Sequence, residues 1–80
     1  MSVEDKQIAM RVRREVVRRR LDASRLFIFC TRGTVELGGT VGPAQKGAAM
    51  DYEHELQIIK ERCTRLPGVR DVVWPYLQYH

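Results

Sequence analysis

The sequence predicts a small α+β domain in which two helices pack on one face of a three-stranded mixed sheet. Two segments have the apolar spacing of one-sided helices, and three shorter apolar segments are bounded by turn residues. Eighty residues suffice for one domain, so residues 1–80 are predicted to fold as a single unit. In chain order, the predicted elements are a helix at 4–20, strands at 25–31 and 34–41, a helix at 46–65 and a strand at 69–74.

The first predicted helix has one apolar and one basic face. At 100° per residue, three aliphatic side chains share the inner face: Ile8, Val12 and Val16. Three basic side chains share the opposite face: Arg11, Arg14 and Arg18. Arg19 would rotate onto the apolar face, so the helix is expected to end near that residue. Val17 lies off the inner face and is expected to be partly exposed.

The two strands that follow are predicted to form a hairpin. Arg32-Gly33 reads as its tight turn, because glycine readily adopts the positive φ that two-residue hairpin turns need. Gly38-Gly39 lies inside the second strand and indicates either a bulge or a close approach of another backbone.

The first strand of this hairpin is apolar on both faces. Successive side chains of a strand point to opposite faces. One face carries Leu26, Ile28 and Cys30, which are expected to lie under the helices. Phe27 and Phe29 then project from the other face, where either a second copy of the chain or the C-terminal segment Trp74–Tyr79 is expected to cover them. Phe27, Phe29 and Trp74 are the residues predicted for such a partner surface.

The second helix and the last strand complete the sheet. Apolar residues recur along this helix at spacings of four and three: Tyr52, Leu56, Ile59, Cys63 and Leu66. Pro67-Gly68 stops the helix, and Pro75 ends the last strand or places it at an edge. A right-handed β-α-β crossover should make the last strand parallel to the second strand.

The sequence offers no clear catalytic or metal-binding group of residues. The two cysteines, Cys30 and Cys63, lie in apolar runs and are expected to be small buried side chains. The two histidines, His54 and His80, are expected to face solvent, away from the cysteines and from any ligand cluster. We therefore expect a protein that is not an enzyme and that uses no cofactor or metal.

Positive charge is concentrated at the start of the chain. Residues 1–25 contain eight Lys or Arg and four Asp or Glu, whereas residues 26–80 contain six of each class. Six arginines stand between residues 11 and 20, and nothing in the predicted core requires them. Arginine suits bidentate contact with phosphate. This patch predicts an anionic partner, either a phospholipid surface or nucleic acid.

The run from Arg25 to Lys46, together with the later LPGVRDVVWPYL, resembles a BON domain over residues 5–77. The matching positions are Gly33, Val35, Leu37, Gly39, Val41, Gln45, Lys46, Pro67, Gly68, Val69 and Val72. The resemblance implies an α-β-β-α-β fold without enzymatic activity. BON domains are bacterial domains thought to bind phospholipid membranes or to assist attachment to the cell envelope.

The leading functional expectation is a membrane-associated module that contacts anionic phospholipid through Arg11, Arg14 and Arg18. The first alternative is a protein–protein or self-association module that uses the open sheet face, and the second is nucleic-acid binding. A small-molecule substrate is not expected. The N-terminal segment does not resemble a signal peptide, which predicts a cytoplasmic or peripheral membrane location; a signal removed beforehand would make it periplasmic.

Overall fold

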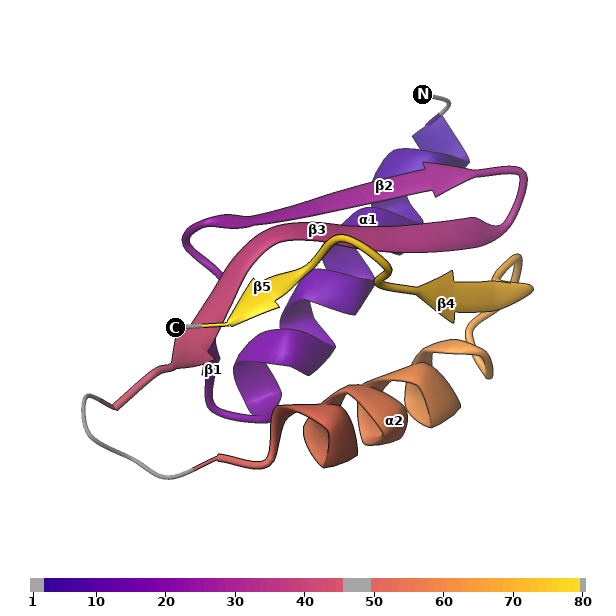
Figure 1. Cartoon of the computed structure of the whole chain (residues 1–80). Coiled ribbons are helices and arrows are strands. Elements are labelled where there is room, and N and C mark those ends of the chain that lie inside the picture. Colours follow the sequence, from indigo (N-terminus) through magenta and orange to yellow (C-terminus); the bar gives the residue numbers. More distant parts are fainter. Residues whose placement is uncertain (1–2, 46–49, 80) are drawn as a thin grey trace.

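The computed structural model describes residues 3–45 and 50–79 and confirms the α+β class (Figure 1). Two helices and five strands are present in these ranges. In chain order they are α1 (Val3–Arg18), β1 (Leu21–Asp22), β2 (Leu26–Thr31), β3 (Thr34–Pro43), α2 (Tyr52–Cys63), β4 (Asp71–Val73) and β5 (Gln78–Tyr79). The predicted ends of the first helix and of the hairpin strands agree with these bounds to within two residues.

The sheet is built around the long strand β3 and has five strands rather than the three predicted. Along one side of β3, β1 and β2 pair antiparallel to it. Along the other side, β4 and β5 pair parallel to it. The parallel direction of β4 agrees with the right-handed crossover predicted for the last strand. The chain leaves the sheet between the two strands on each side of β3. Residues 23–25 separate β1 from β2, and a turn around Pro75, whose ring nitrogen has no hydrogen to donate, separates β4 from β5. The prediction missed the two-residue pieces, β1 and β5, beyond these interruptions.

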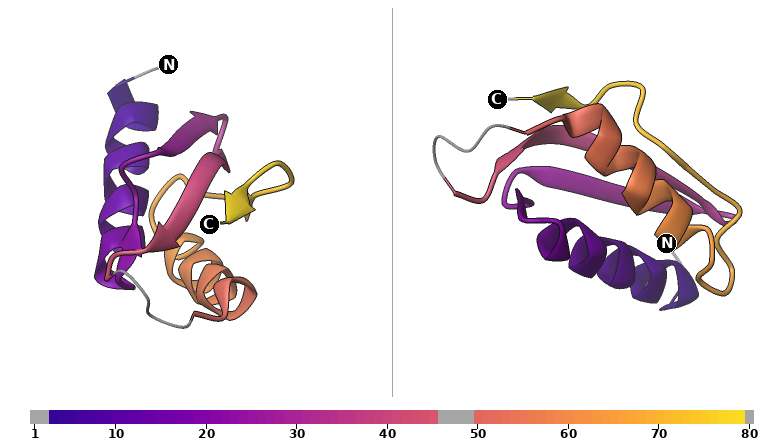
Figure 2. Two further views of the ribbon diagram at one scale, coloured as in Figure 1. Left: turned by 60° about the vertical axis from the view of Figure 1, so that its left-hand side comes forward. Right: turned by 90° about the horizontal axis from the view of Figure 1, so that it is seen from below.

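Both helices cover the same face of the sheet. In Figure 1, α1 lies behind β2 and β3, and in the view from below in Figure 2 α1 runs beneath the strands while α2 crosses in front of them. One core cluster contains Val12 and Val16 from α1, Leu56 and Ile59 from α2 and Leu37 from β3, and each of these side chains is at most 1% exposed. Six core residues were named from the sequence and all are buried: Leu26, Ile28, Val35, Leu37, Ile59 and Val72.

The β2–β3 hairpin has the predicted turn and the predicted register. Arg32 and Gly33 have φ values of 51° and 87°, so both central residues of the turn lie in the left-handed region, as a type I′ turn requires. Gly39 also has a positive φ of 82°, and a Cβ there would collide with the Arg25 carbonyl and the Phe27 ring. The close backbone approach predicted for Gly38-Gly39 is therefore confirmed at Gly39.

The second helix is shorter than predicted. It spans Tyr52–Cys63 instead of 46–65, and Asp51 is its N-cap, because the Asp51 Oδ1 accepts a hydrogen bond of 3.2 Å from the His54 N–H. A capping aspartate satisfies one of the free amides of the first turn and so defines the start of the helix. Residues 46–49 of the predicted helix lie outside the described residues.

The last predicted strand is also shorter, since β4 covers only Asp71–Val73 of the expected 69–74. The Val69 N–H donates to the Leu66 carbonyl over 3.1 Å, which places Val69 in the turn that follows α2. Pairing with β3 begins only after the Arg70 N–H reaches the Gly33 carbonyl over 2.7 Å.

Candidate functional site: the outer face of α1

The three arginines predicted as the anion-binding site all lie exposed on α1, on the side away from the core. Arg18 is paired, because its Nη1 lies 3.0 Å from Oε1 of Glu15 one turn earlier on the helix. Within the described part of the chain, Arg11 and Arg14 form no ion pair or side-chain hydrogen bond. Arg11 and Arg14 therefore present the most available positive charge of the predicted set.

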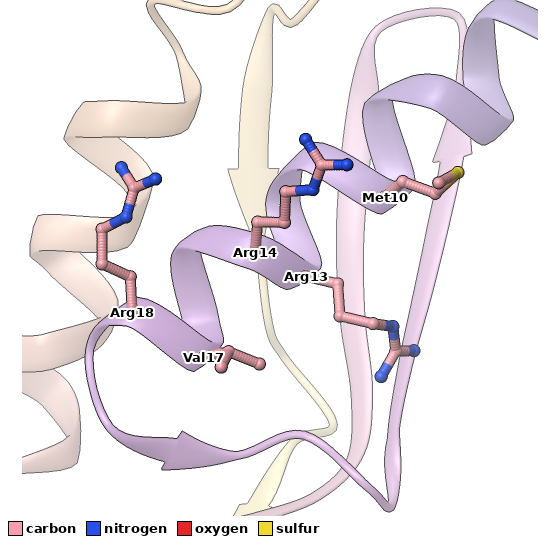
Figure 3. Close-up of a pocket in the computed structure, with 5 residues that line it drawn as sticks. All are labelled: Met10, Arg13, Arg14, Val17 and Arg18. Carbon is pink, nitrogen blue, oxygen red and sulfur yellow. The ribbon is translucent and has the colours of Figure 1, made fainter.

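The structure adds two exposed apolar side chains to this face. Met10 and Val17 are 59% and 57% exposed, and they stand two helical turns apart with Arg13 and Arg14 between them (Figure 3). These four residues and Arg18 line a shallow groove of about 590 Å³. The sequence had placed Val17 off the core face, but it had not linked Met10 and Val17 to the arginines.

Arg13 has a structural role that the sequence did not predict. Its Nη1 donates to the Ala23 carbonyl over 2.7 Å, and its Nη2 donates to the Leu26 carbonyl over 3.0 Å. The guanidinium group thereby ties the middle of α1 to the segment between β1 and β2. Arg13 lines the groove, but its donors are already directed at the protein's own backbone.

Arg19 is also used within the fold. Its Nε lies 2.6 Å from Oε2 of Glu55, which joins the end of α1 to α2. The hydrogen bond to Glu55 raises the pKa of Arg19 further, although burial acts against it. Neither arginine belongs to the buried core, but Arg13 and Arg19 both make contacts within the fold that the sequence did not predict.

The outer face of the sheet is open, as the strand register predicted. Phe27 and Phe29 are 59% and 55% exposed, and their ring centroids are 6.5 Å apart. Trp74 does not join them. It lies across β3, where Lys60 of α2 stands 6.0 Å from its ring centroid, and it packs against the core.

The C-terminal segment does not cover the two phenylalanines, so that part of the expectation is wrong. Leu77 is buried in the core, and the Tyr79 ring stacks on Tyr52 of α2 at 4.9 Å. The Tyr79 hydroxyl also donates to Oε1 of Glu53 over 2.5 Å. These contacts hold the tail along the side of β3 next to α2.

Groups of three or more His, Cys, Asp or Glu that could hold a metal ion are absent from residues 3–45 and 50–79. Cys30 and Cys63 are both buried and unpaired. Burial, and to a lesser degree the charge of Glu15, raises the pKa of Cys63 to about 11. The Cys63 thiol is therefore protonated at neutral pH, and a thiol is a poor nucleophile in that form.

In the described ranges, no helix has the length and apolar character needed to cross a bilayer. In comparisons with known proteins, no family model, curated protein or solved structure matches this chain. The similarity to BON domains therefore stays a prediction from the sequence, and the functional argument depends on the residues themselves.

Proposed function

We propose that this protein is a non-enzymatic module that binds anionic phospholipid surfaces through the outer face of α1. The observation that supports the proposal most is the position of two exposed apolar side chains, Met10 and Val17, beside exposed Arg11 and Arg14 on one helix. A helix that lies in a membrane interface needs both features, since basic groups contact phosphate and apolar groups enter the acyl boundary.

The expected strength is modest. A basic residue close to an anionic membrane contributes about 1 kcal/mol, so Arg11, Arg14 and Arg18 together contribute about 3 kcal/mol. Full burial of a valine or methionine side chain contributes about 1.5–3 kcal/mol, and Met10 and Val17 are already partly covered. Insertion of Met10 and of Val17 into the membrane is then expected to contribute about 1–2 kcal/mol each to binding. The sum describes a weak, reversible, salt-sensitive association.

The proposal is tested by sedimentation with vesicles of anionic or neutral lipid. The test variant is Arg11→Gln/Arg14→Gln/Arg18→Gln. Its matched control removes three exposed arginines away from α1, as Arg62→Gln/Arg65→Gln/Arg70→Gln, so both variants lose the same charge. A loss of about 3 kcal/mol predicts binding about 100-fold weaker for the test variant.

The control separates a specific surface from a general charge effect. Wild type and control should bind anionic vesicles and leave neutral ones in solution. Equal loss of binding in both triple variants would show that only net charge matters and would contradict the α1 site. Single-stranded RNA is added as a competitor, because nucleic-acid binding also depends on salt. Tighter binding of RNA than of vesicles, lost in the same α1 variant, would assign the surface to nucleic acid instead.

A further inference from the structure

We propose that the C-terminal end of α1 forms a binding site for a phosphomonoester group, with Arg20 as its main cationic ligand. The site is a hollow of about 280 Å³, which is lined by Arg18, Arg19, Arg20, Met50 and Glu55. The hollow lies where the end of α1 meets the start of α2, and the ion pair between Arg19 and Glu55 holds these two ends together (Figure 1).

Arg20 supplies a positive charge that is free for a ligand. Its side chain is exposed and makes no ion pair or hydrogen bond within residues 3–45 and 50–79. Its backbone is held on both sides, because the Arg20 N–H donates to the Val17 carbonyl over 2.9 Å and the Arg20 carbonyl accepts from the Ala44 N–H over 3.0 Å. A guanidinium group carried by a fixed backbone loses less conformational freedom when it binds a ligand.

The two neighbouring arginines add charge that is only partly neutralised. Arg19 Nε lies 2.6 Å from Oε2 of Glu55, and Arg18 Nη1 lies 3.0 Å from Oε1 of Glu15. With Arg20 unpaired, these side chains have one positive charge in excess. The Arg18 side chain is 66% exposed, and an exposed ion pair contributes little to stability. Arg18 is therefore able to turn from Glu15 towards a bound phosphate.

The chemistry of these side chains favours a phosphomonoester. Arginine forms paired hydrogen bonds with phosphate oxygens, and a phosphomonoester carries a charge of about −1.5 to −2 at pH 7. That charge suits two guanidinium groups, those of Arg18 and Arg20. A second hollow of about 410 Å³ is lined by Arg20, Ala44, Gln45 and Met50. Arg20 and Met50 line both hollows, so the second one provides adjoining space for the rest of the ligand.

Two sources present this chemistry, a lipid headgroup and a soluble phosphate. Arg18 favours the lipid headgroup, because it lines both this hollow and the groove on the outer face of α1. A membrane that contacts the α1 groove thus brings its headgroups next to Arg20. The choice of a lipid source rests on the proposed function, whereas the phosphomonoester site itself does not.

The backbone of Arg20 offers a matched pair of variants. Its φ is 61°, in the left-handed region where glycine is the usual residue after a helix. Arg32, at the tip of the β2–β3 hairpin, has a similar φ of 51°, so this strain alone does not indicate a site. Arg20→Gly and Arg32→Gly each relieve such strain and remove one positive charge. Of the two, Arg20→Gly is the variant that removes a side chain lining the hollow.

The first test compares vesicles that contain phosphatidic acid, a phosphomonoester, with vesicles that contain phosphatidylglycerol, a phosphodiester, at matched surface charge. Wild type and Arg32→Gly should bind the phosphatidic acid vesicles several-fold more tightly. Arg20→Gly should lose this preference and still bind phosphatidylglycerol vesicles as Arg32→Gly does. Its Tm should be no lower than that of wild type, because glycine adopts a positive φ without strain. An equal preference in both glycine variants would overturn the proposal.

The second test uses inorganic phosphate, titrated into the isotope-labelled protein and followed by nuclear magnetic resonance. Amide shifts at Arg20 and Ala44 that disappear in Arg20→Gly support the site. If they occur without a preference for phosphatidic acid, the ligand is a soluble phosphate and the lipid source is wrong. If wild type shows neither the lipid preference nor the shifts, the site is overturned. Shifts in a protein that binds no vesicles at all would remove the proposed function and leave the phosphomonoester site standing.

Discussion

Arg13 provides a direct test of how the fold uses the arginines of α1. Its two hydrogen bonds to the Ala23 and Leu26 carbonyls cross from the helix to the sheet. A hydrogen bond from a charged donor contributes about 1.5–3 kcal/mol when well shielded, but the Arg13 side chain is exposed, so water competes for it. We therefore expect Arg13→Gln to reduce the free energy of unfolding by about 1–2 kcal/mol. For a domain of this size, that lowers the Tm by about 5–15 °C.

Arg14→Gln is the matched control for this variant. It removes the same charge from the next residue, but the Arg14 side chain makes no hydrogen bond or ion pair within the described residues. Urea unfolding, followed by circular dichroism, should show Arg14→Gln within about 0.5 kcal/mol of wild type. Equal stability of the two variants would refute the structural role of Arg13, and the six arginines would then form one solvated face.

Three further predictions concern the core and its titrating groups. Leu37→Ala, at a fully buried position, should cost about 2–5 kcal/mol in urea unfolding, and an unchanged midpoint would contradict its burial. Burial, and then the hydrogen bond to Glu53, raises the pKa of Tyr79 to about 12, so its contribution to stability should be present below pH 10 and disappear as the pH rises towards 12. Absorbance titration should therefore show late ionisation of Tyr79, and Glu53→Gln should move that ionisation to lower pH. Because burial raises the pKa of both Cys30 and Cys63, a thiol reagent at neutral pH should modify them quickly only after unfolding; rapid reaction of the folded protein would contradict this.

The sequence was sufficient for the parts of the fold that depend on local periodicity. Alternation along 25–31 correctly separated Ile28 from Phe27, and the helical spacing of Val12 and Val16 correctly identified the inner face of α1. The Arg32-Gly33 turn was predictable because its φ values are determined locally. These features could be predicted because the periodicity of a helix or strand determines from the local sequence on which face each residue lies.

The missed features depend on contacts between distant residues. β5 is only two residues long and has no alternation to detect; its place depends on Tyr79 stacking on Tyr52. The role of Arg13 was hidden because its acceptors are backbone carbonyls, which sequence patterns do not identify. The start of α2 did have a signal, since Asp51 immediately precedes the first helical residue and is a favourable N-cap.

The candidate site was predicted only in part. The angular spacing of Arg11, Arg14 and Arg18 placed them on one face, but it did not show that Arg18 pairs with Glu15. The spacing also could not predict that Met10 is exposed, because its exposure depends on how α1 packs against the sheet. That exposure turns a basic helix face into one that combines charge with apolar groups.

The most direct test of the central claim is to map the lipid contact on the labelled protein. Nuclear magnetic resonance of the isotope-labelled chain, with anionic nanodiscs that carry a paramagnetic lipid, reports which amides approach the acyl boundary. Our account predicts the strongest signal loss along α1 at Met10, Arg14 and Val17, with little change at Phe27 and Phe29. Signal loss centred on Phe27 and Phe29, with α1 unaffected, would contradict it.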